Sequence, residues 1–187
     1  MKKLLFVLLA CMLVSAPGFS LLKVDGAMTG FAKGPMAVGV GLEFPLIPFF
    51  PTTLYYHSIG EQKINFEASV YKELTGEVKV KAYALELAIE FPLGFAGVNV
   101  GGTVLGDFFT GEAGGKDAIL PGSIYSGLFG RYRKALLPFV DLYATLGFLA
   151  KTVDGEKEIN KKTGVNIDMG DVDKSGLYYR AGLTIGF

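Results

Sequence analysis

The stretch that decides the fold is the end of the sequence, Ser175 to Phe187, which reads S-G-L-Y-Y-R-A-G-L-T-I-G-F. Apolar side chains occupy every second position of this stretch, and polar or small residues occupy most of the positions between them. Because successive side chains of a β-strand point to opposite faces, such a strand has one apolar and one polar face. This pattern is typical of a strand that lies between lipid and the polar interior of a barrel.

The apolar face of this stretch ends in a phenylalanine and consists of Leu177, Tyr179, Ala181, Leu183, Ile185 and Phe187. A terminal phenylalanine preceded by apolar residues at every second position resembles the closing strand of bacterial outer-membrane β-barrel proteins. The resemblance is to the small, eight-stranded class as a whole and not to one member. The resemblance implies that the barrel-assembly machinery recognises an insertion signal in this strand, formed by Tyr179, Leu183, Ile185 and Phe187.

The beginning of the chain has the features of an export signal. Lys2 and Lys3 precede the apolar run from Leu4 to Val14, and small residues follow. Such a run is too short to span a membrane as a helix, so we expect residues 1–20 to be a cleaved signal peptide and residues 21–187 to form the barrel. The alternative is a lipoprotein cleavage box, L-L-A-C, which would place a lipid on Cys11.

The composition favours strands over helices as the membrane-spanning elements. Half of the residues are hydrophobic, yet no uninterrupted apolar run of membrane-helix length follows residue 20. The 18 basic residues balance the 18 acidic ones, so no electrostatic case for nucleic acid exists. The single cysteine, Cys11, would leave with the signal peptide, which excludes disulfides and thiolate metal sites from the mature chain.

Alternation of apolar and polar residues predicts an all-β, antiparallel, up-and-down transmembrane β-barrel of eight strands. The strands are expected at residues 22–29, 37–44, 64–71, 83–91, 98–107, 124–133, 140–151 and 177–187. None of the eight apolar faces carries a charge, as lipid contact requires, because a Lys or Arg facing lipid near the midplane costs about 2–4 kcal/mol. An even strand count places the turns 91–94 and 134–138 with both termini in the periplasm. The longer segments 109–122 and 154–174 then lie outside the cell.

Two segments do not fit this pattern. Residues 45–62 are too long and too aromatic for a periplasmic turn and could hold an extra strand near Thr53–Ser58. A further strand in 156–168 would then be needed to keep the strand count even, which gives a ten-stranded barrel as the alternative. Val78, Val80 and Ala82 are out of phase with Tyr83 and the residues after it. A β-bulge near Ala82, or a strand that continues above the membrane, would explain the change of phase.

The polar faces of the predicted strands carry both signs of charge. An eight-stranded barrel is just wide enough for side chains to fill it, so we expect a salt-bridged lumen and no open pore. The inward charges are predicted to be Lys23, Asp25, Glu43, Glu67, Glu86, Glu90, Asp107, Arg131, Arg133, Asp141, Lys151 and Arg180.

No catalytic residue, metal site or cofactor site is predicted. His57 and Ser58 are neighbours on the chain, and neighbours on a strand point to opposite faces, so they cannot act together as base and nucleophile. We expect His57 at a surface or interface, although a lipid-modifying hydrolase or acyltransferase that uses another serine stays open. The acidic residues of 166–173 lack the spacing of an EF-hand, which predicts a solvated loop.

The function predicted first is an envelope-structural or surface-interaction protein in the outer membrane of a diderm, Gram-negative bacterium. Its expected partners are outer-membrane lipid and, during insertion, the barrel-assembly machinery, with no nucleic acid; the sequence identifies no extracellular partner. A narrow channel for small solutes is the alternative, because inward glycines could leave a gap; these are Gly39, Gly41, Gly101, Gly182 and Gly186. A further alternative is a soluble periplasmic barrel that binds an apolar ligand inside.

Overall fold

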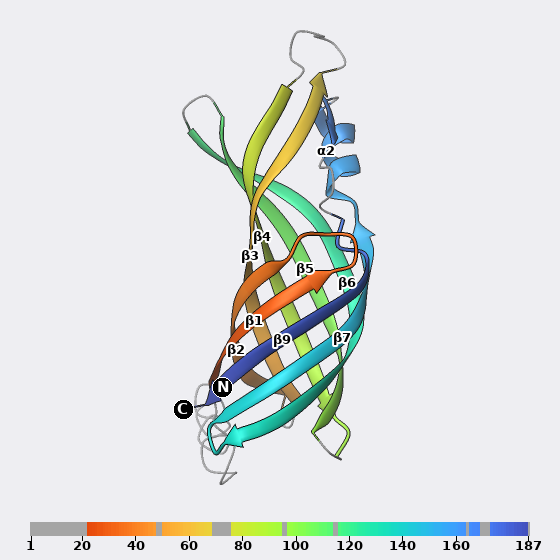
Figure 1. The fold of residues 1–187 in the computed structure, drawn as a ribbon. Helices are drawn as coiled ribbons and strands as arrows, with labels where there is room; N and C mark the ends of the chain where they lie inside the picture. Colours follow the sequence, from red (N-terminus) through yellow and green to blue (C-terminus); the bar gives the residue numbers. More distant parts are fainter. Residues whose placement is uncertain are drawn as a thin grey trace, which may run out of the picture.

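Eight antiparallel strands close into a barrel (Figure 1). The computed structural model describes residues 22–47, 50–68, 76–94, 97–113, 116–163, 165–168 and 173–186. The barrel strands are β1 (Lys23–Phe31), β2 (Ala37–Ile47), β3 (Phe50–Ala68), β4 (Gly76–Pro92), β5 (Val98–Ala113), β6 (Lys116–Leu137), β7 (Val140–Val153) and β9 (Gly176–Gly186). Each barrel strand pairs with the next one along the chain, and β9 pairs with both β7 and β1, which closes the sheet. The predicted fold class and the count of eight are confirmed.

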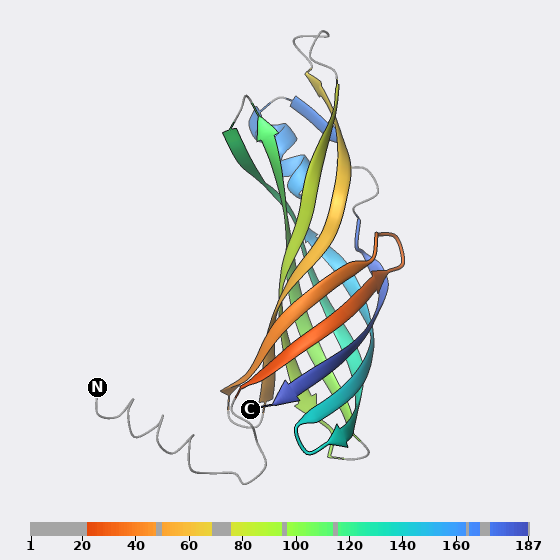
Figure 2. The same ribbon diagram turned by 60° about the vertical axis from the view of Figure 1, so that its left-hand side comes forward.

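The first strand begins and the last strand ends at the same end of the barrel, here called the terminal end; the opposite end is the distal end. In the closing pair, Lys23 lies opposite Gly186 and Phe31 lies opposite Tyr178. The connections from β2 to β3, from β4 to β5 and from β6 to β7 are short and lie at the terminal end (Figure 2). The prediction that the short turns lie at the same end of the barrel as the start of the first strand and the end of the last is therefore confirmed.

The prediction for the third strand is wrong. The segment 45–62 is largely the barrel-crossing part of β3, which begins at Phe50, and β2 before it extends to Ile47. The stretch 64–68 is the distal continuation of that strand, and residues 69–71 lie outside the described residues. The alternation was hard to see because the inward positions of this segment hold threonine, tyrosine and histidine in place of charges.

The distal end is built from extended hairpins. The β3–β4 ladder continues to the pair Phe66–Gly76, and the β5–β6 ladder continues to the pair Ala113–Lys116. The short strand β8 (Val165–Asp168) pairs with the free edge of β3, and the helix α2 (Gly155–Thr163) contacts β6 and β8. The segments 109–122 and 154–174, expected as loops, therefore consist largely of strand and helix where the structure describes them (Figure 1).

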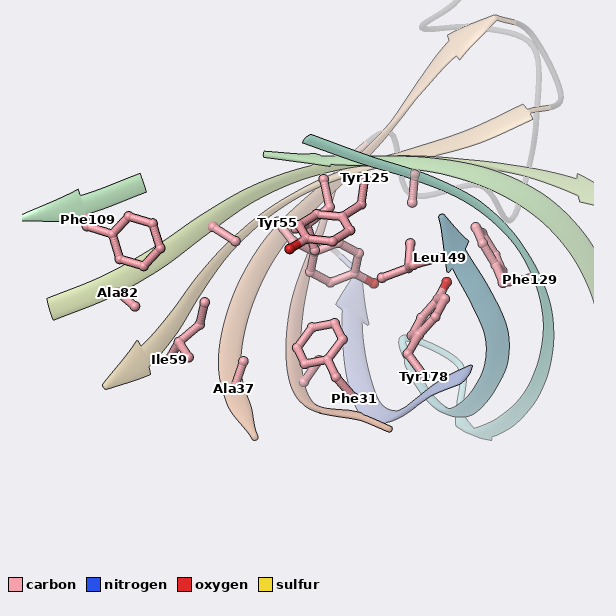
Figure 3. Close-up of a cluster of buried hydrophobic side chains, with 14 of the residues drawn as sticks. Phe31, Ala37, Tyr55, Ile59, Ala82, Phe109, Tyr125, Phe129, Leu149 and Tyr178 are labelled. Atoms are coloured by element: carbon pink, nitrogen blue, oxygen red, sulfur yellow. The ribbon is translucent and has the colours of Figure 1, made fainter. Parts of the chain in front are cut away.

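The two faces of the sheet differ sharply in chemistry. Every barrel strand exposes large apolar side chains on the outside, among them Val24, Val40, Leu54, Leu87, Val104, Leu128, Leu146 and Leu177. Most of the inward side chains are buried. They include charged and polar side chains as well as a cluster of apolar and aromatic ones (Figure 3). In the part of the chain described, no helix is long and apolar enough to span a membrane.

The predicted β-bulge near Ala82 is misplaced. Val80, Ala82 and Ala84 are all buried, so β4 keeps one phase where its side chains are described, from Lys79 onward, and its inward face turns apolar toward the distal end. The irregularity lies across the ladder in β3, where the register shifts between Ser58 and Gly60 and Gly60 adopts φ +94°. The alternative of a strand continuing past the barrel does describe β4, which begins at Gly76.

Candidate functional site

The candidate site is the interior of the barrel, where buried charged side chains form a set of linked contacts, here called the lumen network. Its charged members are Lys23, Asp25, Glu43, His57, Glu86, Glu90, Asp107, Arg131, Arg133, Asp141, Lys174 and Arg180. Every barrel strand contributes at least one of these residues, and Lys174 comes from the segment before β9.

Glu90 is the centre of the network near the terminal end. It accepts hydrogen bonds from the guanidinium groups of Arg131 and Arg133, and Asn99 Nδ2 donates to Glu90 Oε2 at 2.8 Å. Arg133 Nη2 also binds Glu43 Oε2 at 2.5 Å. A buried carboxylate surrounded by two cations and an amide has its charge compensated, as a buried charge requires.

The repeated sequence E-F-P-L supplies two of these carboxylates. Glu43 and Glu90 each precede a phenylalanine and a proline near the end of a strand, and both side chains meet on Arg133. The repeat therefore brings two carboxylates to one guanidinium. Lys23 Nζ completes this end of the network, 3.5 Å from Glu43 Oε1 and 3.3 Å from Asp141 Oδ2.

Glu86 is the centre of the network in the middle of the barrel. Arg180 Nη2 lies 2.5 Å from Glu86 Oε2, His57 Nε2 lies 2.7 Å from the same oxygen, and Thr103 Oγ1 donates to Oε1 at 2.8 Å. Arg180 Nε donates to Thr29 Oγ1 at 2.9 Å. Every one of these side chains is almost fully buried, so each depends on the others for its polar partners.

His57 is buried inside the barrel and contacts Glu86, so the expectation of a surface or interfacial histidine is wrong. The error follows from the misplaced third strand, since a histidine in a turn would be exposed. Ser58 is exposed on the other face of the strand, in agreement with the predicted separation of the two side chains.

Asp25 is held by hydroxyl groups. Tyr143 Oη donates to Asp25 Oδ1 at 2.6 Å, and Tyr55 Oη and Thr184 Oγ1 donate to Oδ2 at 3.0 and 3.2 Å. The faces of the same two tyrosines carry the cations, with the Cζ atoms of Arg131 and Arg180 each 4.4 Å from a ring centroid. The tyrosines thus connect the carboxylate to the guanidinium groups by cation–π contacts.

The distal part of the network includes a residue that alternation could not reveal. Lys174 lies before β9, outside any strand, yet its side chain is buried and its Nζ lies 2.7 Å from Asp107 Oδ2. The ammonium is also within 5.8 Å of the ring centroids of Phe31 and Tyr125. Burial lowers the pKa of the Lys174 ammonium, and the Asp107 charge acts in the opposite direction.

Two of the predicted inward charges lie elsewhere. Glu67 belongs to the part of β3 that has passed the end of β2 and pairs with β8, so it lies beyond the closed barrel, and its side chain is outside the described residues. Lys151 lies at the distal rim, exposed, with its Nζ 3.7 Å from Asp173 Oδ1. The remaining ten predicted charges face the interior; they are Lys23, Asp25, Glu43, Glu86, Glu90, Asp107, Arg131, Arg133, Asp141 and Arg180.

The residues expected to form the insertion signal lie on the outer face of β9 where they are described. Tyr179 and Ile185 are exposed and Leu183 is half-buried, and Phe187 is outside the described residues. Of the expected acidic loop, Asp173 accepts hydrogen bonds from Ser175, and Asp171 is not described. Among the residues that the structure describes, no group of three or more His, Cys, Asp or Glu side chains could hold a metal ion.

Four of the five inward glycines lie against side-chain rings. A Cβ atom added at Gly39 would lie within 3.0 Å of the His57 ring, and one at Gly41 would meet the Tyr55 ring in the same way. The rings of Phe129 and Tyr143 occupy the equivalent space over Gly101 and Gly182. Each of these glycines makes room for a ring from a neighbouring strand, which fills the lumen.

This packing predicts that Gly182→Val lowers the free energy of unfolding by about 1–3 kcal/mol, because the added methyl groups would overlap the Tyr143 ring. Urea titration of the protein in lipid vesicles measures the change. Gly130→Val is the matched control, since nothing lies within 4 Å of a Cβ there. Equal stability of the two variants would contradict a filled interior at Gly182.

Comparisons with known proteins identify no family for the chain. No family model and no curated protein matches it. Similar solved structures include the N-terminal β-barrel domain of Pseudomonas aeruginosa OprF, with 10% identity, coverage of 91% of this chain and 100% of that one, and a TM-score of 0.48. Neisserial surface protein A has 16% identity, coverage of 89% and 94%, and a TM-score of 0.47. Ail, the attachment invasion locus protein of Yersinia pestis, has 9% identity, coverage of 89% and 95%, and a TM-score of 0.40.

Proposed function

We propose that this chain is an integral outer-membrane β-barrel with a sealed lumen, and that it serves the envelope through the structured extension at its distal end. The observation that carries the proposal is the arrangement of the two faces: apolar side chains cover the outside, and the lumen network fills the inside. An apolar outer surface is unfavourable in water and favourable in contact with lipid.

The outer face supports a membrane position. On β7, Leu142, Leu146 and Phe148 are exposed by 42%, 63% and 55%, and the other barrel strands carry similar residues at their outward positions. Contiguous apolar surface that encircles a protein is not tolerated by a soluble monomer. The soluble periplasmic barrel with an apolar interior is contradicted, because the apolar face is outside and most of the charges on the barrel-crossing strands point inward.

Strand length supports an extension beyond the membrane. A tilted strand crosses the hydrocarbon core in about 9–11 residues, whereas β3 has 19 residues and β6 has 22. The surplus lies at the distal end, where β8 and α2 add to the hairpins. With the terminal end in the periplasm, this extension is the part of the protein that faces the cell exterior, and it is therefore the surface available to a partner.

The sealed lumen weighs against the channel alternative. Arg131, Arg180, Glu86 and Glu90 are each at most 2% exposed and are bound to one another or to neighbouring hydroxyl groups. An ion that crossed the barrel would have to displace these contacts, and breaking one buried pair costs about 3–5 kcal/mol.

The proposal predicts that the refolded protein inserts into planar bilayers without producing conductance steps. Insertion is scored separately, by the faster gel mobility of unheated protein compared with boiled protein extracted from the same vesicles. The variant Arg131→Ala/Glu90→Ala, which removes two large buried side chains together, is the positive control and should produce small steps. Uniform steps from the unmodified protein would establish a channel instead.

Residues 1–20 and Phe187 are assigned from the sequence as export signal and insertion signal. The assignment predicts that deletion of Phe187 reduces the heat-modifiable fraction formed in the presence of the barrel-assembly machinery. Deletion of the exposed residue Lys33, in the β1–β2 connection, is the control and should leave that fraction unchanged. An undiminished fraction without Phe187 would place the insertion signal elsewhere.

A further inference from the structure

The connection that leads into β9 enters the distal mouth of the lumen. Strand pairing begins at Gly176, and the three residues before it, here called the strap (residues 173–175), lie outside any strand. The side chain of Lys174 is nevertheless completely buried. The strap also packs against the β1–β2 connection, since a Cβ atom at Gly34 would lie 3.2 Å from the carbonyl oxygen of Asp173 and 3.6 Å from Cγ of Lys174.

Lys174 reaches from the strap to a distant strand of the barrel. Asp107 is on β5, and β7 and β6 separate that strand from β9. Lys174 Nζ lies 2.7 Å from Asp107 Oδ2, and it is 5.8 Å from the ring centroids of Phe31 on β1 and Tyr125 on β6, both labelled in Figure 3. A carboxylate and the faces of two aromatic rings are groups that bind an organic ammonium. The barrel wall therefore forms an ammonium site, which the lysine of the strap occupies.

This buried ion pair holds the strap more firmly than the contacts at the rim. The side chains of Lys174 and Asp107 are 0% and 2% exposed. Asp107 Oδ1 accepts no hydrogen bond from the residues that the structure describes, so the buried carboxylate depends on Lys174 for compensation. The Lys151–Asp173 pair at the rim is longer, at 3.7 Å, and its side chains are 31% and 35% exposed. Such an exposed pair contributes little to stability.

The two partners of the buried pair differ in their freedom to move. Asp107 is fixed in the β4–β5 ladder, where it lies opposite Ala84. Lys174 belongs to a connection and carries its ammonium on a long, flexible stem. If the carboxylate lost its charge, the ammonium would gain hydration by leaving the lumen, and the strap would move with it.

We propose that Lys174 is a latch that closes the distal mouth of the lumen, and that removal of its ion pair with Asp107 opens the strap. Opening leaves Asp107, Phe31 and Tyr125 on the barrel wall, so the site then takes an organic ammonium ligand from outside. Glu86 and the network below it stay closed. The inference rests on the sealed lumen of the proposed function and adds an entrance to its distal part.

The test compares two single substitutions, Ala84→Cys and Ala88→Cys, in the full chain that carries Cys11→Ser and is refolded in detergent micelles. Both alanines are fully buried on the inward face of β4, and Glu86 lies between them on that face. Ala84 is opposite Asp107 and reports on the latch, while Ala88 is the matched deeper control. The rate of reaction with a small, uncharged, water-soluble thiol reagent is measured after heat-modifiable gel mobility has shown that each protein is folded.

Asp107→Asn should make Ala84→Cys react about a hundredfold faster, because a buried ammonium without a counter-charge favours the open strap. Ala88→Cys should stay protected. Asp107→Asn/Lys174→Met should bring the rate at Ala84→Cys back to within about tenfold of its starting value, since methionine packs against aromatic rings without a charge. Lys151→Gln, which removes the exposed pair of the strap, should change the rate by less than about twofold.

An unchanged rate at Ala84→Cys in Asp107→Asn would overturn the latch, and so would an equal rise in Lys151→Gln. A double variant, Asp107→Asn/Lys174→Met, that reacts as fast as Asp107→Asn would exclude expulsion of the ammonium as the cause. Equal rises at Ala84→Cys and Ala88→Cys, or loss of the folded band in Asp107→Asn, would show that the whole lumen depends on the pair. Fast reaction of Ala88→Cys without any further substitution would contradict the sealed lumen itself.

The ammonium site is tested separately with Lys174→Ala, which removes the amine and keeps the carboxylate and the rings. n-Butylammonium chloride, whose cation resembles the lysine side chain, should slow the reaction of Ala84→Cys severalfold in this variant, and sodium chloride at the same concentration should not. In Asp107→Asn/Lys174→Ala, which lacks the carboxylate, the two salts should act alike. Equal effects of the two salts in Lys174→Ala would overturn the ammonium site.

Discussion

Glu86→Ala is expected to lower the free energy of unfolding by about 3–5 kcal/mol, the largest effect of a single substitution in this barrel. The substitution removes the carboxylate that binds Arg180 at 2.5 Å, His57 at 2.7 Å and Thr103 at 2.8 Å. The guanidinium of Arg180 would stay buried without a counter-charge, and the lost hydrogen bonds leave buried donors unsatisfied. Urea titration in lipid vesicles, followed by gel mobility, measures the change.

Glu61→Ala is the control for this substitution, because Glu61 is an exposed carboxylate on a neighbouring strand. Its replacement should change the free energy of unfolding by less than about 0.5 kcal/mol. A loss at Glu86 no larger than the loss at Glu61 would show that the lumen network contributes little to stability.

Leu146→Arg is expected to cost about 2–4 kcal/mol, because the side chain lies in the middle of the outer face of β7 and would place a charge in lipid near the midplane. The cost is specific to a membrane. In a soluble barrel, replacing an exposed leucine by arginine would be neutral or favourable.

Leu137→Arg provides the matched control, since Leu137 has similar exposure but lies at the terminal end, where an arginine can reach the headgroup layer. The cost there should be about 0–1 kcal/mol. Folding yield and unfolding midpoint in the same vesicles compare the two variants. Equal costs at Leu146 and Leu137 would contradict a membrane centred on the middle of the strands.

The barrel fold could be predicted from the sequence because lipid and a polar interior impose a strict alternation on most strands. The correctly predicted strands have charges such as Glu86, Arg131 or Arg180 at inward positions. In these strands the charged inward face differs clearly from the apolar outward face. In β3 the inward positions include Thr53, Tyr55 and His57, and tyrosine and histidine are compatible with either face. The polar and apolar faces therefore differ little in this segment, and the sequence indicates a strand near Thr53–Ser58 only as an alternative.

The contacts within the lumen could be predicted only in part. Alternation determines the face of the sheet on which a side chain lies, but it does not determine the register between neighbouring strands. The register therefore decides that Arg133 meets both Glu43 and Glu90. Lys174 was missed because it enters the lumen from outside any strand. The inward glycines suggested a gap, because the rings that cover them come from neighbouring strands.

Single cysteines along β7, in a variant with Cys11 replaced by serine, would test most directly whether the barrel is both membrane-embedded and sealed. The measurement is the reaction of each cysteine with a small, charged, water-soluble thiol reagent in intact lipid vesicles, with the denatured protein as reference. A sealed membrane barrel predicts that the outward positions Ala144 and Leu146 and the inward positions Thr145 and Leu149 are all protected, while the rim position Lys151 reacts. Reaction at the inward positions alone would establish an open channel, and reaction at the outward positions would contradict the membrane position.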